Sequence, residues 1–506
     1  MASRPSSRAD RRLRFAELEP QDVYVYESHP PSPKRKPLAL PPPSNDDTDA
    51  VSLGTWKGRM APPSAAEPAE PEEGTPEFIR RRYFPNAQAD DPSLAWMAPS
   101  DSTNSSPPST LRFDLHGHPI PPALSSQLPT SLGLHHHAEG SHAGYTLDDI
   151  FLLSRSTVPS QRTIMFGVLS GIAASLSKLK NGEPIPLLEE LRGKEEELRK
   201  RIIAAGVEAL NERGSVGVRA IEVVWQCLVG WDAAIIAVGM EGVWLESAAG
   251  EAVRSMSLAF LLPSFSQMLN QNAGAYPNES LVQVLEIIER LALENEANAA
   301  RVAKEDKLLS GVVRTFLLSP QGHPNVSALH LLTLLARASR QIARELAHTF
   351  SDDLLRFIAI IPDTSPYPLV IAQSLATSTL HFYNALADYG YSAHIPSNAT
   401  AEIARLSQYA SENPGPLSAA WAALVESWTT CAVDPHVTTP PHDITWSRVA
   451  AWGWQTDMLA LLENAPSSSH GDRVVWSKAF GALAAWLEGA KVNGVRGGEK
   501  EREELL

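Results

Sequence analysis

From Thr146 to about residue 490, apolar residues recur at the spacing of an α-helix. In the segment 215–231, for example, Val218, Ile221 and Leu228 fall on one side of the predicted helix. Comparable runs cover residues 160–178, 249–270, 279–293, 306–318, 329–346, 367–388, 414–430, 446–463 and 472–489. Short breaks such as NGEPIP, NAGAYPN, SPQGHPN and IPDTSPYP separate them. Almost no stretch alternates every second residue as a half-buried strand does, so the pattern predicts an all-α fold.

Many helices of moderate length joined by tight turns are typical of an α-solenoid of the HEAT or armadillo kind. No repeat of one fixed length is evident in the sequence. We therefore predict an irregular α-solenoid, a superhelical domain over residues 146–490, and keep a compact pair of all-α domains as the alternative. The segment GSVGVR (214–219) does not follow a strand, and we interpret it as a turn that joins helices.

The first predicted helix carries a start signal. Thr146 is followed three residues later by Asp149, which is the spacing of a capping box with aspartate in place of the usual glutamate. Leu147, Ile150 and Leu153 then fall on one face. The helical domain is therefore expected to begin here.

Residues 1–107 have a different composition. Of the 40 prolines in the chain, 23 lie within the first 130 residues, and proline resists helix interiors. We predict a long, disordered, Pro/Ser-rich N-terminal region. It contains a basic cluster, Lys34 to Lys36, which is either a nuclear-localisation signal or without a role. It also contains an aromatic and arginine-rich segment, 77–97, which we expect to dock on the folded half or on a partner. Residues 491–506 form a charged tail.

Charge and cysteine content narrow the function. The net charge of -15 is a poor match for bare nucleic acid, so we expect protein partners and no direct nucleic-acid binding. The two cysteines, Cys227 and Cys431, form no CxxC pair and are expected to be buried and inert. No signal-peptide core and no apolar run long enough for a membrane span is seen. We expect a soluble protein of the nucleus and cytoplasm.

Six of the fifteen histidines lie between His116 and His142, three of them consecutive at 135–137. In an extended chain His135 and His137 share a face, so a four-histidine metal site is geometrically conceivable. Only Asp114 and Glu139 lie nearby as acids, and no HExxH motif is present. We interpret the histidines as structural or partner-contacting, with a bound metal as the alternative. No P-loop, GxSxG or kinase motif set is found, so no enzyme activity and no cofactor are predicted.

Two segments are unusual for a helical protein. Residues 111–146 are rich in proline and glycine yet carry several apolar side chains, so we expect an irregular segment that follows a specific course along the helical core. Residues 428–454 carry four tryptophans. We interpret them as a bulky inter-helix loop packed by its tryptophans, with a recognition surface as the alternative.

These segments also carry a resemblance. RFDLHGHPIPP and LGLHHHAEGSHAGYTLDDIFLLSRSTVPSQR resemble the start of the C-terminal region of the RNA polymerase II-associated protein 1 family. CAVDPHVTTPPHDITWSRVAAWGW is similar to a second element of that family, and IRRRYFP with the later WM is similar to a segment upstream. The resemblance covers roughly 76–163 and 428–454. It marks these residues as partner-contact candidates: Arg112, Phe113, Asp114, Gly117, His135, His136, His137, Gly144, Tyr145, Asp434, His436, Trp446 and Trp454.

The resemblance implies a non-enzymatic scaffold that binds RNA polymerase II subunits and supports assembly and nuclear import of the polymerase, and hence transcription. It further implies GPN-loop GTPases and chaperone assembly factors as partners. The chain departs from the family's pattern in one respect, because residues 1–75 show no counterpart of the family's N-terminal polymerase-associated domain. From the residues alone, a general helical transport adaptor and a metal-dependent enzyme built on the histidines stay as alternatives.

Overall fold

The computed structural model describes residues 111–127, 143–239, 244–245, 250–271, 273–433, 444–464 and 470–493. The chain divides into two units, Met1–Ser105 and Ser106–Leu506, and every described residue belongs to the second. The predictions for the N-terminal region, for His135 to His137, for Asp434 and His436, and for most of the charged tail fall outside the described residues.

The described part opens with a small antiparallel hairpin. Strand β1 (Arg112–Phe113) pairs with β2 (Pro119–Ile120), so that Arg112 lies opposite Ile120. Phe113 also forms an isolated bridge with Tyr145, and the short helix α4 (Pro122–Ser125) follows β2. Strands of two residues are too short to produce an alternation, which is why the sequence pattern predicts none here.

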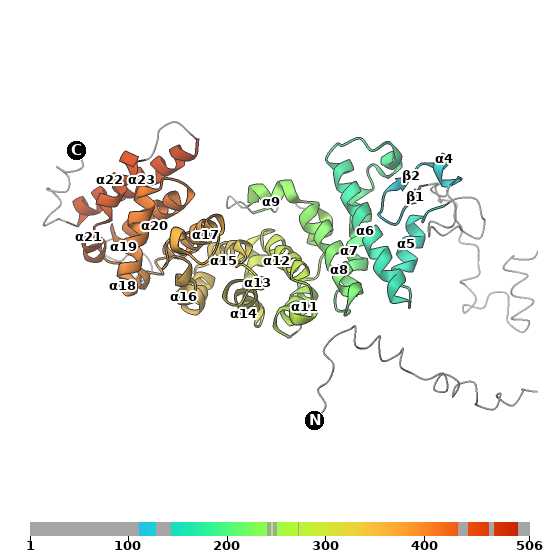
Figure 1. Cartoon of the computed structure of the whole chain (residues 1–506), viewed down its shortest axis with the longest axis horizontal. Coiled ribbons are helices and arrows are strands. Elements are labelled where there is room, and N and C mark those ends of the chain that lie inside the picture. Colours follow the sequence, from blue (N-terminus) through green and yellow to red (C-terminus); the bar gives the residue numbers. More distant parts are fainter. Residues whose placement is uncertain are drawn as a thin grey trace, which may run out of the picture. The chain divides into compact units, whose positions relative to one another are not determined.

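Helices make up almost all of the rest, as predicted, and follow one another in chain order (Figure 1). They are α5 (Leu147–Leu153), α6 (Pro159–Lys180), α7 (Glu195–Ala209), α8 (Ser215–Trp225), α9 (Ala233–Gly239), α10 (Glu251–Arg254), α11 (Leu258–Gln271), α12 (Asn278–Ala292), α13 (Glu296–Lys304), α14 (Leu308–Val313), α15 (Val326–Ala338), α16 (Arg340–Leu354), α17 (Leu369–Ala387), α18 (His394–Asn398), α19 (Thr400–Glu412), α20 (Pro416–Val433), α21 (Trp446–Trp452), α22 (Trp454–Asn464) and α23 (His470–Val492). Short 3-10 or π turns are η3 (Pro186–Leu191), η4 (Gln226–Gly230), η5 (Ala273–Ala275), η6 (Arg314–Leu318), η7 (Leu355–Phe357) and η8 (Pro362–Thr364).

Three predicted segments differ in detail. The run 249–270 is divided between α10 and α11. The run 446–463 is divided at Gly453, whose φ of +71° ends α21 in the left-handed conformation that glycine tolerates. The GSVGVR prediction is wrong, because only Gly214, with φ +73°, lies before the helix and Ser215 already begins α8. Val216 and Ala220 are buried on that helix, and their burial favours helix over turn.

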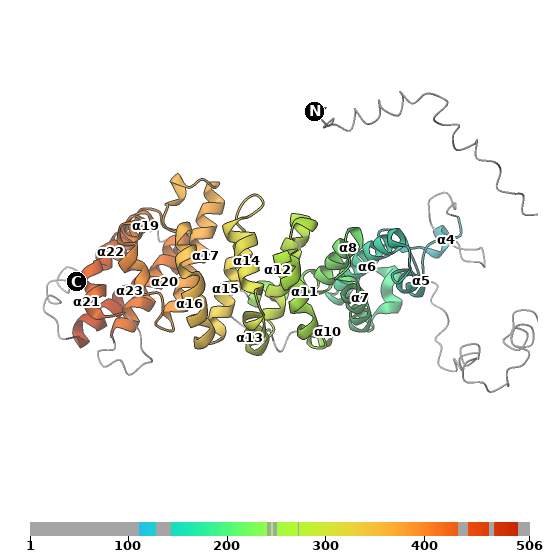
Figure 2. The same ribbon diagram turned by 90° about the horizontal axis from the view of Figure 1, so that it is seen from below.

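Most helices pack on near neighbours in the chain. α6 packs on α7 and α8, α8 on α12, α12 on α15, α15 on α16 and α17, α17 on α20, and α20 on α23 (Figure 2). On α12 the buried residues include Leu281, Val284, Leu285 and Ile288, at the three- and four-residue spacing of a helix stripe. One apolar cluster continues through these layers. The all-α class is confirmed, and the solenoid type stays a prediction.

A buried ionic network connects α7, α12 and the turn between η4 and α9. Asp232 accepts hydrogen bonds from Arg199 on α7, at 2.9 Å, and from Arg290 on α12, at 2.7 Å. Arg290 also pairs with Glu294 at 3.1 Å, and the four side chains are at most 2% exposed. Two positive and two negative charges balance there. Removing one partner would leave a buried charge uncompensated, which costs about 3–5 kcal/mol.

Candidate partner-binding site

The turn between β1 and β2 is built around Asp114. Its carboxylate oxygen Oδ1 accepts hydrogen bonds from the backbone N–H groups of His116 and His118, both at 2.8 Å. The backbone N–H of Asp114 donates to the carbonyl of His118 at 3.0 Å. Aspartate is favoured in turns because its short side chain bonds the backbone just ahead of it. Asp114 therefore has a structural role in shaping the hairpin.

This turn rests backbone-to-backbone on α6. A Cβ atom added to Gly171 of α6 would lie 1.9 Å from the carbonyl oxygen of His116. Gly117 has φ +81°, and a Cβ there would lie 2.5 Å from the carbonyl oxygen of Val168. Both distances are far below van der Waals contact, so only glycine allows the turn to approach the helix this closely. The two glycines fix the position of the hairpin on α6.

A second strand-like pairing closes the hairpin from the other side. Phe113 and Tyr145 exchange backbone hydrogen bonds of 2.9 and 3.0 Å, and both side chains are buried. The Arg112 guanidinium donates to the carbonyl of Gly144 at 3.2 Å. Gly144 has φ +104°, and a Cβ on it would lie 2.8 Å from the Ile120 side chain. Residues 143–145 therefore return to the hairpin just before α5 begins.

We call residues 111–127 together with 143–180 the hairpin module. It brings together six of the predicted candidates: Arg112, Phe113, Asp114, Gly117, Gly144 and Tyr145. In the described part of this segment, Leu111, Phe113 and Ile120 join the apolar core, and the course of the whole segment stays a prediction. Contact of the six residues with a partner stays a prediction, because each has a role in holding the module together. His116 and His118 are exposed, whereas His135 to His137 lie outside the described residues.

The predicted capping box is present at the start of α5. The Thr146 hydroxyl accepts a hydrogen bond from the Asp149 N–H at 3.3 Å, and the Asp149 carboxylate accepts one from the Thr146 N–H at 3.0 Å. On the inner face of α5, Ile150 is fully buried and Leu147 and Leu153 are partly buried. The helix therefore starts and faces inward as its sequence predicts.

Apolar residues on the outside of the module were not predicted. Leu152 is 73% exposed on α5, Val158 is 45% exposed before α6, and Ile164 is 47% exposed on α6. Beside Leu152, the Arg201 guanidinium stacks 4.4 Å from the centre of the Phe151 ring. The exposure of Leu152 could have been predicted from the sequence, because this apolar residue lies outside the helical face formed by Leu147, Ile150 and Leu153. Of these side chains, Leu152 is the most exposed.

The predicted tryptophans lie on helices rather than in a loop. We call Trp421, Trp428, Trp452 and Trp454 the tryptophan cluster. The rings of Trp452 and Trp454 stack with centroids 4.6 Å apart, and those of Trp428 and Trp454 stack at 5.3 Å. Trp421 meets Trp454 edge to face at 5.5 Å. Trp428 is fully buried and Trp454 is 5% exposed, so the packing interpretation is confirmed for these side chains.

Trp446, another predicted candidate, contacts α23. Its ring lies 6.0 Å from that of Trp486, and a Cβ on Gly489 would come within 2.1 Å of it. The helices α20 to α23 pack on one another, and α7 to α19 separate them in the chain from the hairpin module (Figures 1 and 2). The two sets of candidates therefore form two sites and not one.

Nucleophilic chemistry finds no support among the described side chains. Ser351 and Asp352 both approach the same ring nitrogen of His394, at 3.4 and 3.2 Å, whereas a catalytic triad uses the two nitrogens separately. Burial raises the pKa of the Cys227 thiol to about 12 and that of the partly buried Cys431 to about 11, so neither is a thiolate at neutral pH. The described residues contain no group of three metal-ligating side chains. Within the same residues, no helix combines the length and apolar character of a membrane span.

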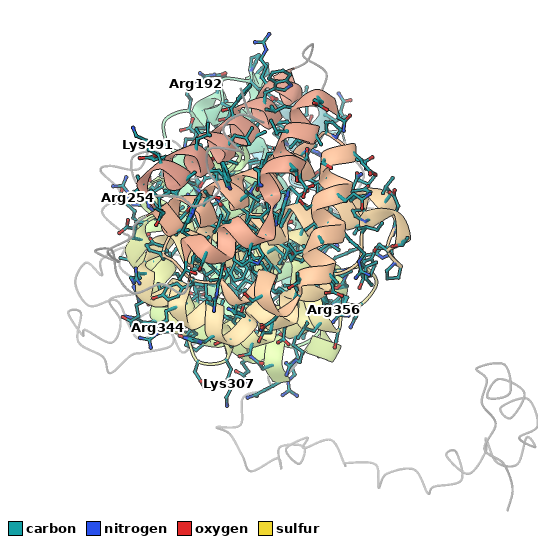
Figure 3. The ribbon with its side chains drawn as sticks, turned by 90° about the vertical axis from the view of Figure 1, so that its left-hand side faces the viewer. Arg192, Arg254, Lys307, Arg344, Arg356 and Lys491 are labelled. Atoms are coloured by element: carbon teal, nitrogen blue, oxygen red, sulfur yellow. The ribbon has the colours of Figure 1, made fainter. Side chains whose placement is uncertain are left out.

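The six cations labelled in Figure 3 do not gather in one patch of that view. They lie apart from one another around its outline, and they are Arg192, Arg254, Lys307, Arg344, Arg356 and Lys491. Arg192 and Lys307 are offset by Glu189 and Asp306. A nucleic-acid surface needs basic side chains in one patch or stripe, and these six residues do not form one.

Comparison with known proteins picks out the hairpin module. A family model described as RPAP1-like, C-terminal, matches residues 110–177. The bovine protein named RNA polymerase II-associated protein 1 is 29% identical over 335 residues, which cover 55% of this chain. Over this module the chain is similar to the RNA polymerase II-associated protein 1 family. The family match covers the module that holds the RFDLHGH and GYT motifs, whereas the tryptophan cluster lies outside the matched range.

Two further relatives show the reach of the family. The human protein of the same name is 28% identical over 348 residues, and the fission yeast protein RNA polymerase II-associated protein rba50 is 33% identical over 162. The matches span 24% of the bovine and human proteins and 35% of the yeast protein. A crystal structure of an engineered protein aligns over 67% of this chain and 88% of its own, at 12% identity and a TM-score of 0.37, which is too low to identify a solenoid type.

Proposed function

We propose that this chain associates with RNA polymerase II through the hairpin module and acts as a non-enzymatic scaffold in assembly and nuclear import of the polymerase. The observation that carries the proposal is the family match at 110–177, together with relatives that are named as RNA polymerase II-associated. The outside of that module offers Leu152, Val158 and Ile164 as exposed apolar contacts. A rigid helical unit suits a scaffold because it presents surface without needing a catalytic cleft.

The test is recovery of the purified polymerase on the immobilised full chain. We expect polymerase subunits to be retained by the wild type, and Leu152→Asp to reduce retention by about tenfold or more, since a buried charge at an interface centre is costly. Phe260→Asp is the matched control, because Phe260 is 46% exposed but lies on α11, away from the hairpin module. Equal loss with both variants, or recovery of transport receptors without polymerase, would contradict the proposal.

The remaining parts of the proposal rest on the resemblance alone. They are the partnership with GPN-loop GTPases and chaperone factors, the presence of the chain in nucleus and cytoplasm, and its role in import. Depleting the chain from its cells should leave the largest polymerase subunit in the cytoplasm, measured by imaging. Unchanged nuclear polymerase after depletion would exclude the import role while leaving polymerase binding to be judged by the retention experiment.

A further inference from the structure

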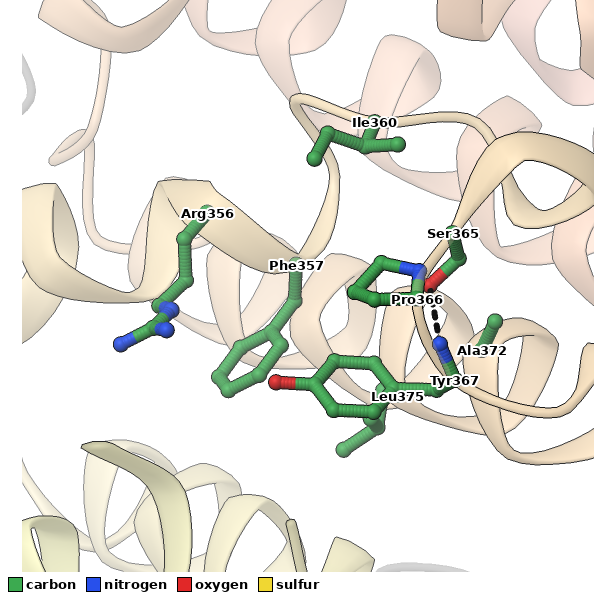
Figure 4. Close-up of a pocket in the computed structure, with 8 residues that line it drawn as sticks. All are labelled: Arg356, Phe357, Ile360, Ser365, Pro366, Tyr367, Ala372 and Leu375. Carbon is green, nitrogen blue, oxygen red and sulfur yellow. Dashed lines mark hydrogen bonds between the residues drawn. The ribbon is translucent and has the colours of Figure 1, made fainter. Parts of the chain in front are cut away.

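A small hollow lies between η7 and the start of α17, on helices outside the hairpin module. Its volume is about 190 Å³, and its floor is formed by Phe357, Ala372 and Leu375 (Figure 4). These three side chains are at most 6% exposed. A dry apolar cavity of about 150 Å³ holds a benzene ring, so this hollow has room for one phenylalanine or leucine side chain of a ligand.

The walls of the hollow are held by one hydrogen bond within the loop and by contacts with two other segments. The Tyr367 N–H donates to the Ser365 hydroxyl at 3.3 Å, and the His323 ring meets the Tyr367 ring edge to face at 6.2 Å. The Tyr409 hydroxyl of α19 donates to the Asp363 carboxylate at 3.0 Å. Because contacts hold the loop at both sides, the hollow is already formed before a ligand binds. Binding therefore does not incur the entropic cost of ordering the loop.

Two hydrogen-bond donors at the hollow have no acceptor among the residues that the structure describes. Arg356 is exposed, stacks its guanidinium 5.7 Å from the centre of the Phe357 ring, and forms no ion pair with any residue in the described ranges. Tyr367 is half-buried, and its hydroxyl has no hydrogen-bond partner in the same part of the chain. Figure 4 shows that this hydroxyl points toward the side of the hollow on which Phe357 and Arg356 lie. Arg356 is the only charged residue that lines the hollow.

None of the three acidic residues nearby lines the hollow. Asp352 approaches His394 at 3.2 Å, and Asp363 accepts the hydrogen bond from Tyr409. Asp353 is exposed and does not line the hollow. The site therefore presents a positive charge beside an apolar floor.

Apolar side chains continue outside the hollow. Ile360, which itself lines the hollow, is 48% exposed. Leu369 and Val370, in the first turn of α17, are 49% and 74% exposed and do not line it. Clustered exposed apolar residues beside a preformed hollow are characteristic of a surface that binds another protein. They would give a ligand further contact area beyond the single anchor.

We propose that this hollow binds a short acidic segment of a partner protein, with one aromatic or leucine side chain in the hollow and an adjacent aspartate or glutamate on Arg356 and Tyr367. The apolar floor selects the anchor, and the two unpaired donors select the carboxylate. A basic segment is disfavoured because Arg356 would repel it. The site lies on η7 and α17, so the proposal does not depend on polymerase binding by the hairpin module.

The experiment uses the full chain and fluorescein-labelled hexapeptides. The probe is Asp-Asp-Phe-Asp-Asp-Leu, with Asn-Asn-Phe-Asn-Asn-Leu and Asp-Asp-Ala-Asp-Asp-Ala as controls for charge and anchor, and affinity is measured by fluorescence anisotropy. We expect the probe to bind at least about tenfold more tightly than either control, because each control lacks one half of the recognition. No binding of the probe, or equal binding of all three peptides, would overturn the proposal.

Substitutions at the hollow test whether the peptide binds there. Arg356→Glu should weaken the probe by at least about tenfold and Tyr367→Phe by a few-fold, whereas Arg344→Glu, on neighbouring α16, should leave it unchanged. Circular-dichroism melting curves check that each variant folds. If Arg356→Glu does not fold, Tyr367→Phe, which keeps the aromatic ring, still tests whether the peptide binds at the hollow. Unchanged affinity in both hollow variants would also overturn the proposal.

Discussion

The hairpin module and the tryptophan cluster are both unusual stretches of sequence, but different forces hold them in place. In the hairpin module, glycines let two backbones meet and Asp114 fixes a tight turn. In the tryptophan cluster, large rings stack on one another with centroids 4.6 to 5.5 Å apart. The first depends on the absence of side-chain atoms at defined points, and the second on their bulk.

This difference changes how the family motifs are understood. Asp114, Gly117 and Gly144 in the module each have a local structural reason, so their presence does not by itself identify a contact surface. The outward-facing Leu152 has no such reason and is the better candidate for contact. A motif and the surface it supports therefore need to be separated before a partner site is assigned.

The largest effect is expected in the tryptophan cluster. Trp428→Ala would remove a fully buried ring that contacts Trp421, Trp452 and Trp454, and should lower the free energy of unfolding by about 4 kcal/mol. Chemical denaturation measures it. Phe480→Ala is the control, because that ring is 52% exposed on α23 and its loss should cost well under half as much. Equal costs would show that the cluster adds no stability beyond ordinary surface contacts.

The second effect tests the backbone contact in the hairpin module. Gly171→Ala places a Cβ against the His116 carbonyl, so the hairpin must move away, at a cost of about 3 kcal/mol. Faster hydrogen exchange of the Phe113 and Tyr145 amides would report it. Gly167→Ala is a matched control one turn earlier on α6, because nothing lies within 4 Å of a Cβ there. Slower or unchanged exchange in Gly171→Ala would contradict the close approach.

Much of the fold was predictable because helical stripes are local. The spacing of Leu281, Val284 and Leu285 is sufficient to predict α12, and Thr146 with Asp149 is sufficient to predict the start of α5. The hairpin was not predictable because each of its strands has only two residues, and neither was the separate bridge that joins Phe113 to Tyr145 across many intervening residues. Local periodicity holds no information about such a pairing.

The candidate sites were predictable only as sets of residues. The motifs marked Asp114 and Gly117, but nothing in the sequence shows that Gly117 meets Gly171 on another element. The hollow at Arg356 is assembled from η7, a loop and α17, so its apolar floor appears only after folding. The sequence therefore indicated which residues are special and not what each one contacts.

The third effect tests the turn at Asp114 separately from the contact between the hairpin and α6. Asp114→Ala removes the acceptor for two backbone N–H groups and should cost about 2 kcal/mol, because both bonds are charge-assisted. Asp114→Asn keeps one carbonyl oxygen in place and should retain most of the stability. Thermal melting compares the two. If alanine and asparagine are equally destabilising, the charge matters more than the turn geometry.

The smallest effect concerns the first helix. Thr146→Ala removes the capping hydroxyl that accepts the Asp149 N–H, and should lower stability by about 1 kcal/mol. Thr146→Ser keeps the hydroxyl and is expected to behave as the wild type. The loss should appear as faster exchange of the first-turn amides of α5, with the tryptophan cluster unaffected because α20 to α23 do not contact this helix among the principal packing pairs. A change in tryptophan fluorescence in Thr146→Ala would show instead that the two regions are coupled through the helices between them.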